Sequence, residues 1–150
     1  MTAPSPAIDV QILRQSVRPV SVEPFPEAAG AECVFVGRTR AETHPEHGPL
    51  VELTYEAYAP LARRVLTDLA RLAAERYACR VVRIHHAVGA VPVGAASVLV
   101  QVACGHRDEA FAACRFLIDR LKATAPIWKR QRWADGATWS AGDPVKPRET

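Results

Sequence analysis

Five segments of the chain carry the hydrophobic pattern of β-strands. Apolar residues alternate with polar ones over residues 8–13 and again over 51–57, as expected where one face of a strand is buried. Residues 31–37 form a short apolar run closed by glycine, which predicts a buried strand. Residues 80–88 and 96–103 have the length and the β-branched composition of two further strands.

The hydrophobic period lengthens to three or four residues in two other segments, which predicts amphipathic helices. The first helix is expected from Pro60 to about Tyr77 and the second over residues 107–124, where Pro126 ends it. The predicted buried side of the first consists of Leu61, Val65, Leu69 and Leu72. That of the second consists of Phe111, Cys114, Leu117, Ile118 and Leu121.

The remaining segments are predicted as connections. Residues 41–49 are polar, with two prolines and a glycine, and predict a mobile loop, while residues 89–94 suit a turn or a bulged corner. The ends, 1–6 and about 140–150, are expected to be flexible, as are parts of the tail from residue 134. Strands and helices in this order favour a single α+β domain over residues 1–150, with two helices on a mixed or mostly antiparallel sheet.

Composition narrows the class of protein. Of the 150 residues, 49% are hydrophobic and 23% charged, which is typical of a globular domain. Neither a membrane-length apolar run nor a signal-peptide pattern is visible, so a cytoplasmic location is expected. The four cysteines contain no CxxC pair, and no set of four zinc ligands can be found, so they are interpreted as small buried residues and no metal is predicted.

Positive charge is concentrated in the C-terminal third. Residues 105–133 contain seven Lys or Arg against three acidic residues, a net charge of +4, whereas the whole chain has only +3. Charge gathered in this way favours an anionic ligand or an acidic partner.

Two groups of residues within this region are candidates for chemistry. His106 and Arg107 start the second predicted helix, where free backbone N–H groups and an arginine can bind a phosphate, although both residues are equally compatible with a solvated strand end. Lys122 and Lys129 flank Pro126. They are either favourable charges near a helix end or a pair whose proximity makes one lysine suitable for proton transfer.

Other polar residues give weaker signals. Arg38 and Arg40 follow the strand at 31–37 and point in a similar direction if that strand continues, but surface arginines are common. His44, His47, His85 and His86 have no partner recognisable from the sequence and are interpreted as structural.

Five motifs together resemble one known family. In chain order they are FVGRTR (35–40), TYEAY (54–58), HHAVGAVPVG (85–94), GHRDEAF (105–111) and LKATAPIWKR (121–130). This order, spread over residues 31–133, resembles the catalytic, large subunit of molybdopterin synthase. The last motif is the most specific, since Lys-x₃-Pro-x-Trp-Lys after a helix is rare elsewhere.

The resemblance implies a hammerhead-like α+β fold and a sulfurtransferase. Members of the family convert cyclic pyranopterin monophosphate into molybdopterin, using sulfur from the C-terminal Gly-Gly thiocarboxylate of a small ubiquitin-like subunit, without a cofactor. They assemble as a heterotetramer around a homodimer. By match to the motifs, the resemblance implies that Lys122 and Lys129 are catalytic, and that Arg40, His106, Arg107 and Arg130 bind the anionic substrate. No membrane or nucleic-acid partner is implied.

The spacing of these residues adds a geometric expectation. His106 and Lys122 are sixteen residues apart on one predicted helix, which separates them by roughly 24 Å. One small substrate cannot contact both from the same chain. A composite site is therefore expected, with His106 and Arg107 supplied by the neighbouring protomer.

The chain departs from the family pattern at three positions. Gln131 stands where many members have glutamate, and Ala87 and Ala95 replace an arginine and an acidic residue, which suggests the paired removal of one ion pair. The alternative to the enzyme is a non-catalytic α+β module that binds RNA or another phosphate ligand through the same basic region. The three tryptophans give this alternative some support.

Overall fold

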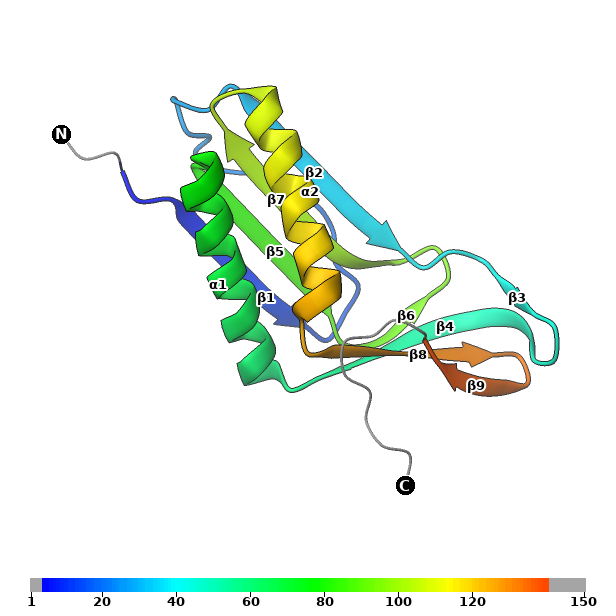
Figure 1. Ribbon diagram of the computed structural model, residues 1–150. Helices are drawn as coiled ribbons and strands as arrows, with labels where there is room; N and C mark the ends of the chain where they lie inside the picture. The colour runs from blue at the N-terminus through cyan, green and yellow to red at the C-terminus, as the bar shows by residue number, and fades with distance from the viewer. Residues whose placement is uncertain (1–3, 141–150) are drawn as a thin grey trace.

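The protein consists of two helices on one face of a sheet, with a second group of strands extending from one end (Figure 1). The computed structural model describes residues 4–140. The helices are α1 (Ala59–Tyr77) and α2 (Arg107–Thr124). The strands are β1 (Ala7–Leu13), β2 (Ala31–Arg38), β3 (Thr43–His44), β4 (Gly48–Ala57), β5 (Val81–Ala87), β6 (Gly89–Pro92), β7 (Ala96–Cys104), β8 (Ile127–Trp133) and β9 (Gly136–Trp139). The predicted α+β class is confirmed.

Two sequence expectations concern the chain ends and membranes. The predicted flexibility of residues 1–3 and 141–150 lies outside the described residues. Within residues 4–140, neither helix is long and apolar enough to cross a membrane.

The main sheet has the order β1-β5-β7-β2 and is mixed, because β1 runs parallel to β5 while the other pairs are antiparallel. Every residue of β7 is buried. The helices cover one face of this strand, and the segment between β1 and β2 packs Val17 and Val22 against the other face of the sheet. Burial on both faces explains why residues 96–103 are apolar except for Ser97 and Gln101, which are themselves buried.

The buried face of α1 differs from the one predicted. Leu61 and Leu72 are 44% and 45% exposed, whereas the residues that face the sheet and α2 are mostly alanines. The buried set is Ala62, Leu66, Ala70, Ala73 and Ala74. Both stripes have helical spacing and differ by one position, so periodicity alone did not choose between them. Small side chains let the backbone of α1 pack closely against its neighbours. This advantage cannot be seen in the hydrophobicity pattern of the sequence.

For α2 the prediction is largely confirmed, because Cys114, Leu117, Ile118 and Leu121 are buried. Phe111 is the exception, with 65% of its surface exposed. Strand β2, predicted to be buried, is instead an edge strand whose Val34 and Phe35 are 40% and 37% exposed. Its apolar composition is that of a central strand, and only the topology places it at the edge.

The second sheet was not predicted from the sequence. It has the order β3-β4-β8-β9, and β6 pairs with the part of β4 that does not pair with β3. Parts of the predicted loop at 41–49, the predicted corner at 89–94 and the predicted tail after residue 134 are therefore strands. Strand β8, with the sequence IWKRQRW, is too polar to resemble a buried strand. Its antiparallel pairing with β4 supplies the hydrogen bonds that the sequence pattern did not reveal.

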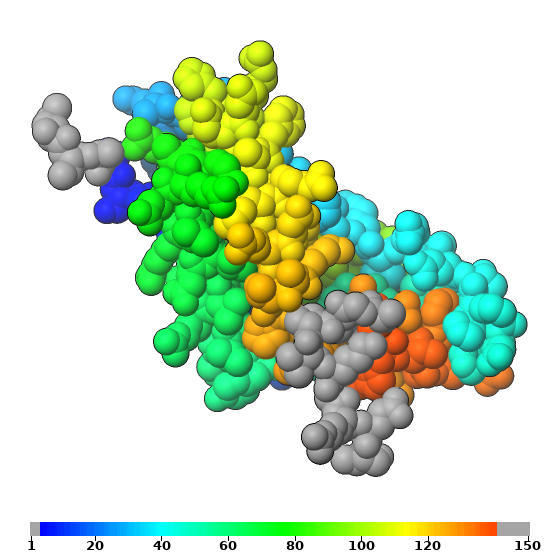
Figure 2. Space-filling model, viewed as in Figure 1, coloured from blue at the N-terminus to red at the C-terminus, as the bar shows by residue number. Residues whose placement is uncertain are grey.

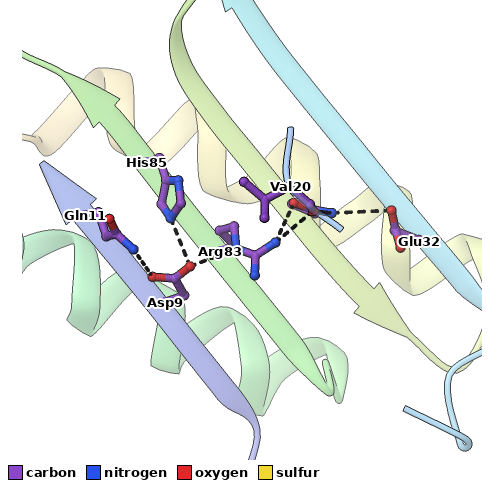
Figure 3. Close-up of polar contacts among 7 residues, drawn as sticks. Asp9, Gln11, Val20, Glu32, Arg83 and His85 are labelled. Atoms are coloured by element: carbon purple, nitrogen blue, oxygen red, sulfur yellow. Dashed lines mark hydrogen bonds and ion pairs between the residues drawn. The ribbon is translucent and has the colours of Figure 1, made fainter. Parts of the chain in front are cut away.

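A polar network lies on the sheet face opposite the helices (Figure 3). The Asp9 carboxylate accepts hydrogen bonds from Arg83 Nε at 2.8 Å and contacts His85 Nε2 at 2.9 Å. Arg83 also donates to the carbonyl of Val20 and to the side chain of Gln101. His85 therefore has a partner, which the sequence did not reveal because Asp9 lies on a strand 76 positions away.

Replacing Asp9 with asparagine is expected to destabilise the protein by roughly 2 kcal/mol, because the guanidinium of Arg83, only 14% exposed, loses its counter-charge. Urea unfolding at neutral pH measures this loss. The matched control is Asp119→Asn, which removes the exposed pair between Arg115 and Asp119 and should change stability by less than about 0.5 kcal/mol. Equal effects of the two variants would show that the network does not stabilise the sheet.

The pH dependence of this effect follows from the pKa of Asp9. Burial raises that pKa, but hydrogen bonds from Gln11, Arg83 and His85 outweigh burial, so the folded-state pKa lies below the ordinary value of 3.8. The stabilisation is therefore fully present above the unfolded-state pKa and is lost as the pH falls through the folded-state pKa. The wild-type protein and Asp9→Asn should converge in stability as the pH falls below 3.8.

Candidate functional site

A cavity of about 530 Å³ lies where the main sheet, the C-terminal end of α2 and the second sheet meet. In Figure 2, α1 and α2 lie side by side on the visible face, and the β3–β4 and β8–β9 turns gather at the end beyond them. The cavity is lined by Gly37, Arg38, Arg40, Glu42, Leu50, Leu53, Tyr55, His86, Ser97, Val98, Leu121, Lys122, Ala125, Ile127, Lys129 and Gln131. It thus draws on segments spread over most of the chain.

Two lysines reach the cavity from either side of Pro126. Lys122 lies in the last turn of α2, and Lys129 lies on β8 opposite Tyr55 of β4. Ala125 adopts an extended conformation because a residue before proline is disfavoured in the helical region, and this ends the helix and starts β8. The Lys-x₃-Pro-x-Trp-Lys spacing therefore turns the chain so that both lysines line one cavity.

Two arginines enter from the end of β2. Arg38 donates to the carbonyl of Gly94 at 3.1 Å, and Arg40 pairs with Glu42 at 3.1 Å while its side chain stays 84% exposed. The register of β2 shifts between Gly37 and Arg38, so simple alternation does not describe the two side chains. Both nevertheless line the cavity, which makes Arg38 a candidate that the sequence singled out only weakly.

The cavity is electrostatically suited to anions. Its lining contains two arginines, two lysines and one acidic side chain, Glu42, which is already paired with Arg40. Cations converging on a partly enclosed space raise the local concentration of anions and can orient them through hydrogen bonds. Among residues 4–140 no group of three or more His, Cys, Asp or Glu is placed to hold a metal ion.

His86 lies deep in the same cavity, and the structure gives it partners that the sequence did not reveal. Its Nδ1 lies 2.7 Å from the carbonyl oxygen of Ala87, and its ring packs edge-on against Tyr55. Burial above all, together with the charges of Lys122 and Lys129, lowers the pKa of His86 to about 4, although the hydrogen bond to Ala87 opposes this shift. The imidazole is therefore neutral at neutral pH.

A sequence signal for His86 did exist. Alternation along β5 places His86 on the same face as Val82 and Ile84, which pack into the core beneath the helices. A polar side chain on the buried face of a strand requires a hydrogen-bond partner or a function. Because successive residues of a strand point to opposite faces, alternation alone would have placed His86 and His85 on different faces.

The structure does not bring the other predicted substrate residues into this cavity. His106 and Arg107 lie at the N-terminal end of α2, are exposed, and are separated from Lys122 by most of a helix about 27 Å long. Arg130 is exposed and adjoins Lys129 and Gln131 on β8 without lining the cavity. A contact between these three residues and the substrate stays a prediction.

The departures from the family pattern also have identifiable surroundings. Ala87 and Ala95 pack into the same small apolar cluster, with Val17, Val91 and Leu99, which fits the paired loss of two charged residues. Gln131 accepts a hydrogen bond from Thr138, which in turn accepts one from the indole of Trp133. Its amide is thus held at the cavity wall without adding a negative charge.

Comparison with known proteins gives a consistent result. Residues 6–124 match the family model described as "MoaE protein". A molybdopterin synthase catalytic subunit from Nostoc sp. is 47% identical over 114 residues, covering 75% of this chain and 68% of that protein. The rice protein of the same name is 42% identical, with 82% of this chain and 63% of the relative covered.

Solved structures agree with the sequence comparisons. Molybdopterin synthase from Staphylococcus aureus superimposes with a TM-score of 0.77 at 29% identity, covering 87% of this chain and 95% of that one. A chain from the Helicobacter pylori complex of subunits 1 and 2 of molybdopterin-converting factor gives a TM-score of 0.69 over 88% of this chain and 90% of that one. At 20% identity the latter similarity concerns the fold alone.

Proposed function

This chain belongs to the MoaE family, whose matched relatives are molybdopterin synthase catalytic subunits, and from this premise we propose the reaction that its cavity performs. The protein is a sulfurtransferase that converts cyclic pyranopterin monophosphate into the dithiolene of molybdopterin. The observation that carries the proposal is the cavity lined by Arg38, Arg40, Lys122 and Lys129. Both the sulfur donor and the substrate are anions, and these cations can hold them together.

The two lysines have different proposed roles. Lys122, at the end of α2, is the candidate for acid–base assistance at the pterin, because it lies beside the apolar wall formed by Leu121 and Ala125. Lys129, on the rim strand β8, is proposed to hold the thiocarboxylate. Arg40 is proposed to bind the substrate phosphate, since an exposed guanidinium whose ion pair is with the neighbouring Glu42 can turn towards an anion.

The proposed sulfur donor is a small ubiquitin-like subunit whose C-terminal Gly-Gly thiocarboxylate enters the cavity. The matched relatives are named as catalytic subunits, which supports an assembly with a further subunit. We also propose that two catalytic chains form the centre of a heterotetramer. A cytoplasmic location suits four cysteines that are free thiols.

The placement of His106 and Arg107 supports the shared-site hypothesis. Each chain would supply the lysine end of one site and the α2 N-terminus of the other site. Arg130, on the exposed side of β8, would meet the substrate only at the rim of such a composite site. The alternative of an RNA-binding or phosphate-binding module gains no support from the relatives described above, which are named as the enzyme subunit.

A reconstituted assay tests the function. The chain is combined with a thiocarboxylated small subunit and cyclic pyranopterin monophosphate, and molybdopterin is measured by fluorescence after oxidation. We expect product that depends on all three components. A stable complex without product would indicate a subunit that has lost activity and would direct attention to Gln131. Failure to bind the small subunit would favour the binding-module alternative.

A further inference from the structure

His86 combines deep burial with access to the cavity. It is only 4% exposed, yet it lines the space between Lys122 and the second sheet. Strand β5 fixes its backbone in the centre of the main sheet, and the edge-on contact with Tyr55, with ring centroids 5.1 Å apart, restricts rotation of the ring. The imidazole is therefore held in one orientation.

The protonation pattern of the ring follows from its hydrogen bond to Ala87. A backbone carbonyl can only accept, so the nitrogen 2.7 Å from Ala87 O must carry the proton. In a neutral imidazole the other nitrogen, Nε2, then has a lone pair and accepts hydrogen bonds. Among residues 4–140, Nε2 of His86 has no hydrogen-bond partner in the structure. It lies at the end of the ring away from the backbone, and is the polar atom left to face the cavity.

This acceptor complements the other cavity groups. The ammonium and guanidinium groups of the lining donate hydrogen bonds and cannot accept them. They suit a phosphate or a thiocarboxylate but not the amino and ring N–H groups of a pterin. A buried, neutral acceptor suits those N–H groups, and its preference is strong because a buried lone pair left without a donor is unfavourable.

We propose that His86 is a substrate-binding residue whose Nε2 accepts a hydrogen bond from an N–H group of the pterin. This rests on the proposed function and adds to it a division of the cavity. The cations bind the anionic part of the substrate, and His86 recognises the heterocycle. With a pKa of about 4, the ring acts as an acceptor at neutral pH and does not add to the positive charge of the cavity.

Two substitutions separate this role from a structural one. His86→Gln can place an amide oxygen near the position of Nε2 but loses the donor to Ala87. His86→Asn can keep a donor near the position of Nδ1 but ends short of Nε2. Calorimetric binding of cyclic pyranopterin monophosphate to the complex with the small subunit should be weakened about tenfold by His86→Asn and much less by His86→Gln. KM should follow the same order, with kcat changed less than KM.

The reverse order, with His86→Asn similar to wild type and His86→Gln impaired, would show that the Ala87 hydrogen bond is what matters and would overturn the proposal. Equal binding by both variants and wild type would also overturn it. If either variant unfolds, His86→Phe keeps the ring and its packing without the acceptor, and should lose binding as His86→Asn does. Inorganic phosphate, which has no N–H group, should bind all variants equally.

The same experiments distinguish failure of this inference from failure of the proposed function. Wild-type product together with unaffected binding by the His86 variants rejects only the role of His86. Absence of product from the wild type rejects the proposed reaction, while calorimetry, which requires no turnover, still reports whether His86 contacts the pterin.

Discussion

Lys122→Ala should reduce molybdopterin formation by a factor of about 100 or more in the reconstituted assay. Lys122 lies in the last turn of α2 and lines the cavity beside His86, so its loss removes both a fixed positive charge and the proposed acid–base group. The side chain is largely exposed and forms no part of the core, so the thermal midpoint should stay close to that of the wild type. The measurement is product fluorescence at saturating substrate.

Two controls determine what the loss means. Lys122→Arg keeps the charge but not the ammonium, and should remain strongly impaired if proton transfer is required. Arg120→Ala removes a cation two positions away on the same helix that lies over the ring of Phe116, outside the cavity, and should leave activity within about twofold. Near-normal activity of Lys122→Ala would contradict the proposed role of this lysine, even if the wild type makes product.

Mixing His106→Ala chains with Lys122→Ala chains should restore activity that neither variant has alone. If each site combines the lysine end of one chain with the α2 N-terminus of another, a mixed dimer contains one intact site and one doubly altered site. Half of the dimers formed at random from equal amounts are mixed, so about a quarter of the wild-type activity is expected. The two chains must be unfolded and refolded together, or co-expressed, to allow exchange.

The matched comparison uses two variants from the same end of the helix. His106→Ala mixed with Arg107→Ala should restore nothing, because both alterations affect the same half of each site. Restoration in neither mixture would reject the shared site, and His106 would then be an exposed residue at a helix start, as its surroundings within one chain permit.

Local pattern was sufficient for most of the elements. Alternation predicted β1 and much of β4, and the two helices begin and end within a residue or two of the expected positions. Strands β8 and β9 were missed because their stability comes from pairing with β4 and with each other, and a polar strand gains its hydrogen bonds only when a partner is present. The buried face of α1 was misassigned by one position because packing favoured alanines over exposed leucines.

The site shows the same division. The motifs singled out Arg40, Lys122 and Lys129, and the structure places these three at one cavity. His86 was not selected from the sequence because its place in the cavity depends on residues far away in the chain. Tyr55, Ser97 and the two lysines come from β4, β7, α2 and β8, and no local spacing reports their convergence.

The sequence by itself determined the helices, most strands, the α+β class and the family, since these depend on side-chain periodicity and on residues close together in the chain. Tertiary structure alone decided which strand lies at the edge, which stripe of α1 is buried, and that His86 is a neutral acceptor among cations. Those properties depend on burial and on charges from residues that are far apart in the sequence. In such surroundings the desolvation of charged groups and side-chain packing outweigh local conformational preference.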